Sequence, residues 1–131
     1  MDDHLLAKIG QYALILNDEG KVLVLERARS KTWCLPGGRL SEGEEWDVAL
    51  MRELLEETGF KYVDSQPFAV NVISDPYQTK YCVYFTVQIE DSSISLSAEH
   101  SGYRWLNKDE ASGLDFEDEK IKDVVVRFLE S

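Results

Sequence analysis

Three glutamates in the segment RELLEETG, residues 52–59, are the side chains of this sequence best suited to chemistry. At about 100° per residue on a helix, Glu56 and Glu57 fall within about 60° of Glu53, so the three carboxylates share one edge. Each like-charged pair repels by on the order of 3 kcal/mol at an effective dielectric constant of about 20, and by less in water. A bound Mg²⁺ would offset this repulsion, because it prefers carboxylate oxygens. An acidic face in contact with water is the alternative interpretation of these residues alone.

The segment SEGEEWDVALMRELLEETG, residues 41–59, predicts the helix that must position these acids. Its first turn is acidic, and Gly59 stands where a helix commonly ends. The face opposite the acids carries Val48, Met51 and Leu55. Leu50 and Leu54 lie to one side of the acidic edge and provide a second packing surface. A helix held on two surfaces would keep its carboxylates in a rigid arrangement.

Most of the remaining elements are predicted strands. QYALILNDEGKVLVLER contains two β-rich runs, residues 11–16 and 21–26, and the turn residues between them predict a hairpin. Further strands are expected at residues 68–74, 80–90 and 102–106, and an amphipathic helix at 117–130. This order of elements predicts an α+β fold in which helices cover a mixed β-sheet.

Composition limits the classes of function. A chain of 131 residues with 44% hydrophobic residues can bury one sizeable core, so residues 1–131 are expected to form a single domain. The net charge of −11 disfavours a nucleic-acid polymer as partner, because such binding depends on Lys and Arg. The sequence also shows no signal peptide or membrane-length apolar run, which predicts a cytoplasmic protein without a membrane partner. Cys34 and Cys82 are widely separated and are expected to be small buried side chains.

A longer pattern surrounds the three acids, in GRLSEGEEWDVALMRELLEETGF from Gly38 to Phe60. Its specified positions are Gly38, Glu44, Arg52, Glu53, Glu56, Glu57 and Gly59. Seven such positions match by accident about once in a billion starting points. This segment resembles the Nudix box of the Nudix hydrolase family.

The resemblance implies a Nudix-type α/β/α sandwich and a hydrolase dependent on Mg²⁺, or on Mn²⁺. The implied substrate is a small nucleotide in which a nucleoside diphosphate is linked to another moiety. Nucleoside triphosphates, ADP-ribose and dinucleoside polyphosphates all remain open as substrates, and the protein could be a monomer or a homodimer. A Nudix-fold module that binds nucleotides for regulation without catalysis is the alternative, although all the acids of the box are present.

The resemblance also implies roles for residues of the box. Glu56 and Glu57 match the principal metal ligands of the family. Glu53 matches a glutamate that binds metal or acts as general base. Arg52 is expected to hold a neighbouring acid in orientation, and the carbonyl of Gly38 is a candidate metal ligand.

Candidates outside the box rest on weaker patterns. Glu99 lies in a polar loop, where several members of the family place another metal ligand or general base. His100 beside it is expected to be a surface residue. Arg27 and Arg29 could reach phosphate oxygens, and Tyr77 could stack on a base, although solvated loop positions explain these three residues equally well or better.

Overall fold

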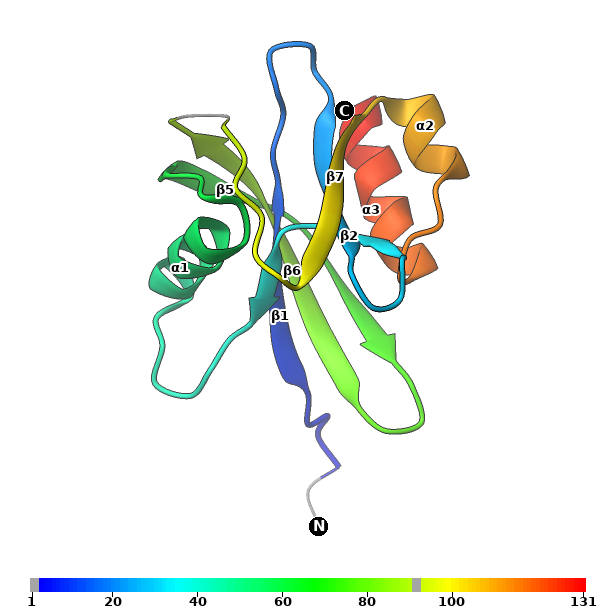
Figure 1. Ribbon diagram of the computed structural model, residues 1–131. Coiled ribbons are helices and arrows are strands. Elements are labelled where there is room, and N and C mark those ends of the chain that lie inside the picture. The colour runs from blue at the N-terminus through cyan, green and yellow to red at the C-terminus, as the bar shows by residue number, and fades with distance from the viewer. Residues whose placement is uncertain (1–2, 91–92) are drawn as a thin grey trace.

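The structure is a computed structural model that describes residues 3–90 and 93–131 (Figure 1). Within these residues the strands form two sheets. The four-stranded sheet has the order β4-β1-β6-β5, with β4 (Gly37–Arg39), β1 (Lys8–Leu14), β6 (Thr79–Ile89) and β5 (Tyr62–Ser74). It is mixed, because β1 runs parallel to β6 while the other pairs are antiparallel. The antiparallel three-stranded sheet has the order β3-β2-β7, with β3 (Trp33–Cys34), β2 (Val22–Arg27) and β7 (His100–Leu106).

Helices lie on both sides of the sheets. Figure 1 shows α1 (Trp46–Thr58) on one side, and α2 (Lys108–Gly113) and α3 (Glu119–Glu130) together on the other. One buried apolar cluster joins β1 and β6 to α3, and the other joins β1 and β2 to α1. The predicted mixed sheet with flanking helices is therefore confirmed. In the described part of the chain, no helix combines the length and the apolar character needed to cross a bilayer.

The predicted hairpin between β1 and β2 forms at its turn but does not continue along the two strands. Its turn forms as expected, because the Asn17 side chain accepts hydrogen bonds from the N–H groups of Glu19 and Lys21 at 3.0 Å each. The strands then diverge into different sheets, and their antiparallel pairing in the described residues is limited to the bridge between Leu16 and Val22 and the hydrogen bonds beside it. Both runs are apolar on both faces and so contribute to both cores, which favours inner strands with neighbours on each side.

Helix α1 starts five residues later than the sequence suggests, because residues 41–45 form a loop. It ends as predicted at Gly59, whose φ of 76° is left-handed and whose N–H donates to the Leu55 carbonyl. The predicted packing of Leu50 and Leu54 is confirmed, since both are fully buried. The opposite apolar face instead remains exposed, at 57% for Val48, 45% for Met51 and 56% for Leu55.

The C-terminal elements follow the predicted pattern with one addition. Helix α3 buries Ile121, Val124 and Val125, and the strands predicted at 68–74, 80–90 and 102–106 correspond to β5, β6 and β7. Helix α2 was not predicted, although Asn107 and Glu110 form a capping box that is readable as Asn-x-x-Glu. Cys34 and Cys82 are buried free thiols, as expected.

Candidate active site

The Glu57 carboxylate is held against the short strand β4. It comes from the last turn of α1 and is only 7% exposed. Its Oε1 accepts a hydrogen bond of 2.9 Å from the N–H of Gly37. Gly37 has a φ of 148°, and a Cβ at this position would lie 2.1 Å from the backbone oxygen of Gln11 in β1. Only glycine therefore lets β4 approach β1 closely enough to receive Glu57.

Glu53 lies one turn earlier on α1 and faces the neighbouring glycine. A Cβ added to Gly38 would come within 2.7–2.8 Å of the Glu53 carboxyl atoms. The carboxylate therefore occupies the space next to the Gly38 backbone that a side chain would fill. Burial raises the pKa of Glu53, and the charges of Glu56 and Glu99 raise it further, while the Arg52 guanidinium opposes the rise.

Glu57 carries the largest carboxyl shift of this cluster. Burial raises the pKa of Glu57 to about 8, and the charges of Glu53 and Glu99 add to the rise, although the hydrogen bond from Gly37 opposes it. Among the described residues, no Lys or Arg forms an ion pair with Glu57 or Glu99. Glu57 and Glu99 thus have no cation within ion-pair distance in this part of the chain, although the positive charge of Arg27 lowers the pKa of Glu57.

Arg52 links the acids of α1 to the loop before it. Its guanidinium lies 3.0 Å from a Glu44 carboxylate oxygen, 3.3 Å from Glu53 and 3.2 Å from Glu56. Glu44 in turn accepts a hydrogen bond of 3.0 Å from the N–H of Ser41. Glu56 is exposed and has Arg52 as its ion-pair partner. The structure thus brings together the acids of the box, with one arginine orienting three of them.

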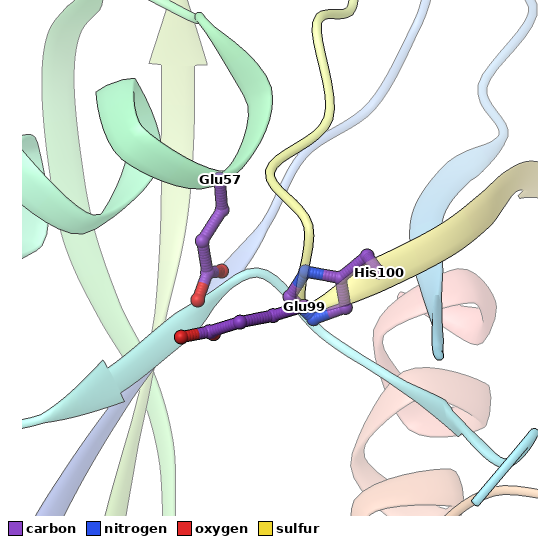
Figure 2. A group of neighbouring side chains, drawn as sticks. All are labelled: Glu57, Glu99 and His100. Atoms are coloured by element: carbon purple, nitrogen blue, oxygen red, sulfur yellow. The ribbon is translucent and has the colours of Figure 1, made fainter. Parts of the chain in front are cut away.

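The loop before β7 brings a fourth acid to the cluster. Figure 2 shows Glu57, Glu99 and His100 pointing toward one another, and one ligand atom from each lies within 4.8 Å of the others. The backbone there is anchored to the second sheet, because the Ala28 N–H donates to the Glu99 carbonyl at 2.9 Å and His100 pairs with Arg27. Glu99 therefore lies beside Glu57, and its role as metal ligand or general base stays a prediction.

His100 is not the surface residue that the sequence suggested. It is 6% exposed, because it opens β7 and its ring packs between the acids and Cys34. Its Nε2 lies 3.7 Å from the Cys34 sulfur. Burial lowers the pKa of His100, and the positive charge of Arg27 lowers it further. Its position two residues before the predicted strand, directly after Glu99, was the sequence signal for this placement.

The three candidates for substrate binding lie in different settings. Arg27 forms an ion pair and hydrogen bonds with Glu117, one of them 3.3 Å long, so its guanidinium already has a partner. Arg29 is exposed in the turn after β2. Tyr77 is 95% exposed in the turn between β5 and β6, and Figure 1 shows that turn well apart from α1. Tyr77 thus lies apart from the acids, whereas Arg27 pairs with His100 in the sheet and its charge lowers the pKa of Glu57.

An apolar recess of about 530 Å³ opens beside the start of α1. It is lined by Ile9, Gln11, Leu40, Trp46, Ser65, Pro67, Val83 and Phe85. Trp46 stacks on Phe85 with ring centroids 5.1 Å apart, and the Gln11 side chain donates to the Trp46 carbonyl at 2.9 Å. Gln11 Oε1 is buried and has no hydrogen-bond partner among the described residues. The sequence did not reveal this recess, because its lining comes from five separate segments.

Comparison with known proteins relates this geometry to one family. The NUDIX domain model matches residues 7–128. A protein named putative 8-oxo-dGTP diphosphatase from Bacillus subtilis is 29% identical over 99 residues, which make up 75% of this chain and 65% of that protein. An RNA pyrophosphohydrolase from Wolbachia pipientis subsp. Culex pipiens is 28% identical over 88% of this chain and 85% of its own length.

Solved structures agree with this match. A MutT protein from Methanosarcina mazei Go1 superimposes with a TM-score of 0.80 at 27% identity, covering 95% of this chain and 96% of that one. The chain spans about two thirds, 65%, of the length of the Bacillus relative. The family model covers nearly the whole sequence and includes every residue of the acidic cluster. The chain therefore belongs to the NUDIX domain family.

Proposed function

We propose that this protein is a nucleotide pyrophosphohydrolase that requires a divalent cation, Mg²⁺ or Mn²⁺. The observation that carries the proposal is the buried carboxylate of Glu57, which lies beside Glu53 and Glu99 without a cationic partner among the described residues. Without a partner such a buried carboxyl keeps its proton, as its raised pKa shows, so its ionised form must be paired or bound to metal. A cation is the partner that fits this donor set.

The residues present fit such a cation. Glu53, Glu56, Glu57 and Glu99 supply carboxylate oxygens, and Gly38 lies beside Glu53 with its carbonyl as a further candidate ligand. Hard oxygen ligands of this kind suit Mg²⁺ and Mn²⁺. When bound, the cation would neutralise phosphate charge and lower the pKa of a bound water.

The protein's own side chains orient the acids and accept the proton of the attacking water. Arg52 positions Glu53 and Glu56 through its ion pairs. In the reaction, the water oxygen forms a bond to phosphorus, and its proton passes to a carboxylate oxygen of Glu53 or Glu99. The phosphoanhydride oxygen leaves with the other phosphate. Both acids remain candidates for the general base, because each has its carboxylate at the cluster.

The apolar recess supports a nucleoside as the organic part of the substrate. Its volume falls within the range of small-molecule sites, and its aromatic and aliphatic lining suits a base. Gln11 lines the recess and also pairs with Gly38 across β1 and β4, so the recess adjoins the acids. The unpartnered Gln11 Oε1 could accept a hydrogen bond from a base amino group.

The names of the relatives favour a triphosphate as the phosphorylated part. One is named for 8-oxo-dGTP and another for RNA pyrophosphate hydrolysis. We favour a small nucleoside triphosphate over an RNA end, because the chain carries a net charge of −11. The predicted single domain over residues 1–131 and the choice between monomer and homodimer stay predictions, and light scattering after gel filtration would test the second.

Hydrolysis of a substrate panel tests this proposal. The metal-stripped protein would be assayed with and without Mg²⁺ or Mn²⁺ on 8-oxo-dGTP, dGTP, ADP-ribose, diadenosine tetraphosphate and a 5′-triphosphorylated oligonucleotide. We expect cation-dependent release of pyrophosphate and a nucleoside monophosphate from one triphosphate. Hydrolysis in H₂¹⁸O would show which phosphorus receives the water oxygen. Nucleotide binding without turnover under every condition would contradict the proposal and favour a regulatory module instead.

A further inference from the structure

The imidazole of His100 is a feature of the acidic cluster that the proposed hydrolysis does not use. It belongs to the group of three side chains whose ligand atoms lie within 4.8 Å of one another (Figure 2). His100 is more than nine-tenths buried, and its Nδ1 has no hydrogen-bond partner among the described residues. Buried polar atoms are almost always partnered, so this nitrogen requires an explanation.

The surroundings of the ring determine which nitrogen carries the proton. The Cys34 thiol lies 3.5 Å from the Leu25 carbonyl and can donate its one hydrogen there. The sulfur can then only accept from His100, whose Nε2 lies 3.7 Å away. With the thiol hydrogen directed at Leu25, the imidazole proton belongs on Nε2. Nδ1 is left with a free lone pair, which is the form that binds a metal.

We propose that His100 supplies an imidazole nitrogen to the cation held by Glu57 and Glu99, so that the site has a mixed oxygen and nitrogen donor set. This inference rests on the proposed function, since it concerns the same cation. Cys34 acts behind the ring as the group that fixes its tautomer. The backbone pairing of His100 with Arg27 in β2 fixes the direction from which the ring approaches.

A mixed donor set changes which metals the site prefers. Carboxylates alone suit Mg²⁺, whereas imidazole binds Co²⁺ and other later transition metals more strongly. Loss of His100 should therefore weaken Co²⁺ binding much more than Mg²⁺ binding, with the effect on Mn²⁺ between the two. A histidine that only packs in the core would change the affinity for all three metals equally or not at all.

The first experiment uses the unaltered protein. Mn²⁺ would be bound to chains carrying ¹⁴N- or ¹⁵N-labelled histidine, and electron spin echo envelope modulation would detect nitrogen coordinated to the metal. The sequence contains two histidines, His4 and His100, so His4→Gln is the matched control. We expect histidine nitrogen modulation in the unaltered protein and in His4→Gln. Its absence from the unaltered protein would overturn the inference.

The second experiment measures affinity by calorimetry with Co²⁺, Mn²⁺ and Mg²⁺ alone. For His100→Asn we expect Co²⁺ affinity to fall roughly 10- to 100-fold, as for other losses at metal sites, and Mg²⁺ affinity to change by less than about threefold. Circular dichroism would verify that the variant is folded. If the variant does not fold, the electron spin echo experiment on the unaltered protein still tests the inference. Equal losses for both metals in a folded variant would contradict the inference.

These results separate the inference from the proposed function. Glu57→Gln should weaken the binding of all three metals, because the Glu57 carboxylate belongs to the oxygen donor set. If that variant loses metal while the unaltered protein shows no histidine modulation, His100 is not a ligand and the proposed function stands. If the unaltered protein binds no divalent cation at all, both proposals fail.

Discussion

The acidic side and the far apolar side of helix α1 differ in burial in the direction opposite to that of an ordinary helix. On one side, Glu53 and Glu57 are partly or largely withdrawn from water, and burial raises the pKa of both carboxyl groups. On the other side, Val48, Met51 and Leu55 face solvent. An ordinary amphipathic helix would bury its apolar side chains and expose its acids.

This contrast shows that apolar burial alone did not orient α1. Leu50 and Leu54 pack into the core, and the Gly37 N–H binds Glu57 at 2.9 Å. These contacts turn the acids toward β4 and leave the far apolar face uncovered. Holding like charges together in a half-buried position costs free energy, and local conflicts of this kind are typical of functional sites.

Removing the charge of Glu57 should have the largest effect on the acidic side. For Glu57→Gln at saturating Mg²⁺ we expect kcat to fall on the order of 10²- to 10³-fold, because a central ligand is lost. Asp47→Asn is the matched control, since Asp47 is an exposed acid in the first turn of the same helix. Steady-state kinetics on the best panel substrate would measure both. Turnover of Glu57→Gln within tenfold of the unaltered protein would refute its role.

Two adjacent leucines test the packing side of the comparison. Leu54 is fully buried, whereas Leu55 is 56% exposed on the same helix. Leu54→Ala should lower the free energy of unfolding by about 2–5 kcal/mol, because it leaves a cavity. Leu55→Ala should change it by no more than about 0.5 kcal/mol. Urea unfolding monitored by tryptophan fluorescence gives both values, and similar losses would mean that α1 is oriented differently.

A side chain that crowds the acids from the β4 side should lower kcat less than Glu57→Gln does. In Gly38→Ala the new methyl group would lie about 2.7 Å from the Glu53 carboxyl carbon, so that flexible side chain must move. We expect kcat to fall by about tenfold with little change in stability, since the reactive groups are misplaced. Gly113→Ala is the control, because its new methyl group would have no described atom within 4 Å apart from its chain neighbours and the backbone of its own helix. Equal activity of both variants would show that Glu53 tolerates displacement.

The buried carboxyl of Glu57 predicts a pH dependence in the metal-free protein. Its pKa is raised to about 8 in the folded state, so between about pH 5 and 8 the native protein keeps a proton that the unfolded chain releases. Its contribution to stability is therefore complete at low pH and is lost as the pH rises toward 8, by at most about 1.4 kcal/mol per pH unit. Urea unfolding in EDTA would show this slope, and Glu57→Gln should lack it. Identical slopes for the unaltered protein and Glu57→Gln would indicate that the Glu57 carboxyl group is exposed to water.

Local features were predictable because they depend on neighbouring residues. The spacing of Glu53, Glu56 and Glu57 follows from the helical period, and the end of α1 follows from a left-handed glycine. The separation of β1 and β2 beyond their turn was not predictable from the same kind of signal. The turn residues were recognised correctly, yet the choice of strand partners depended on β6 and β7, which come from much later in the chain.

The sequence by itself determined the carboxylates, their common edge and the glycines beside them, because residue type and helical periodicity are local properties. Only the tertiary structure decided which acid is buried, that Glu99 and His100 meet Glu57, and that Arg27 pairs with Glu117. Those outcomes depend on how two sheets pack against one helix. Burial, and with it the pKa of a carboxyl group, is a property of that packing and not of any single segment.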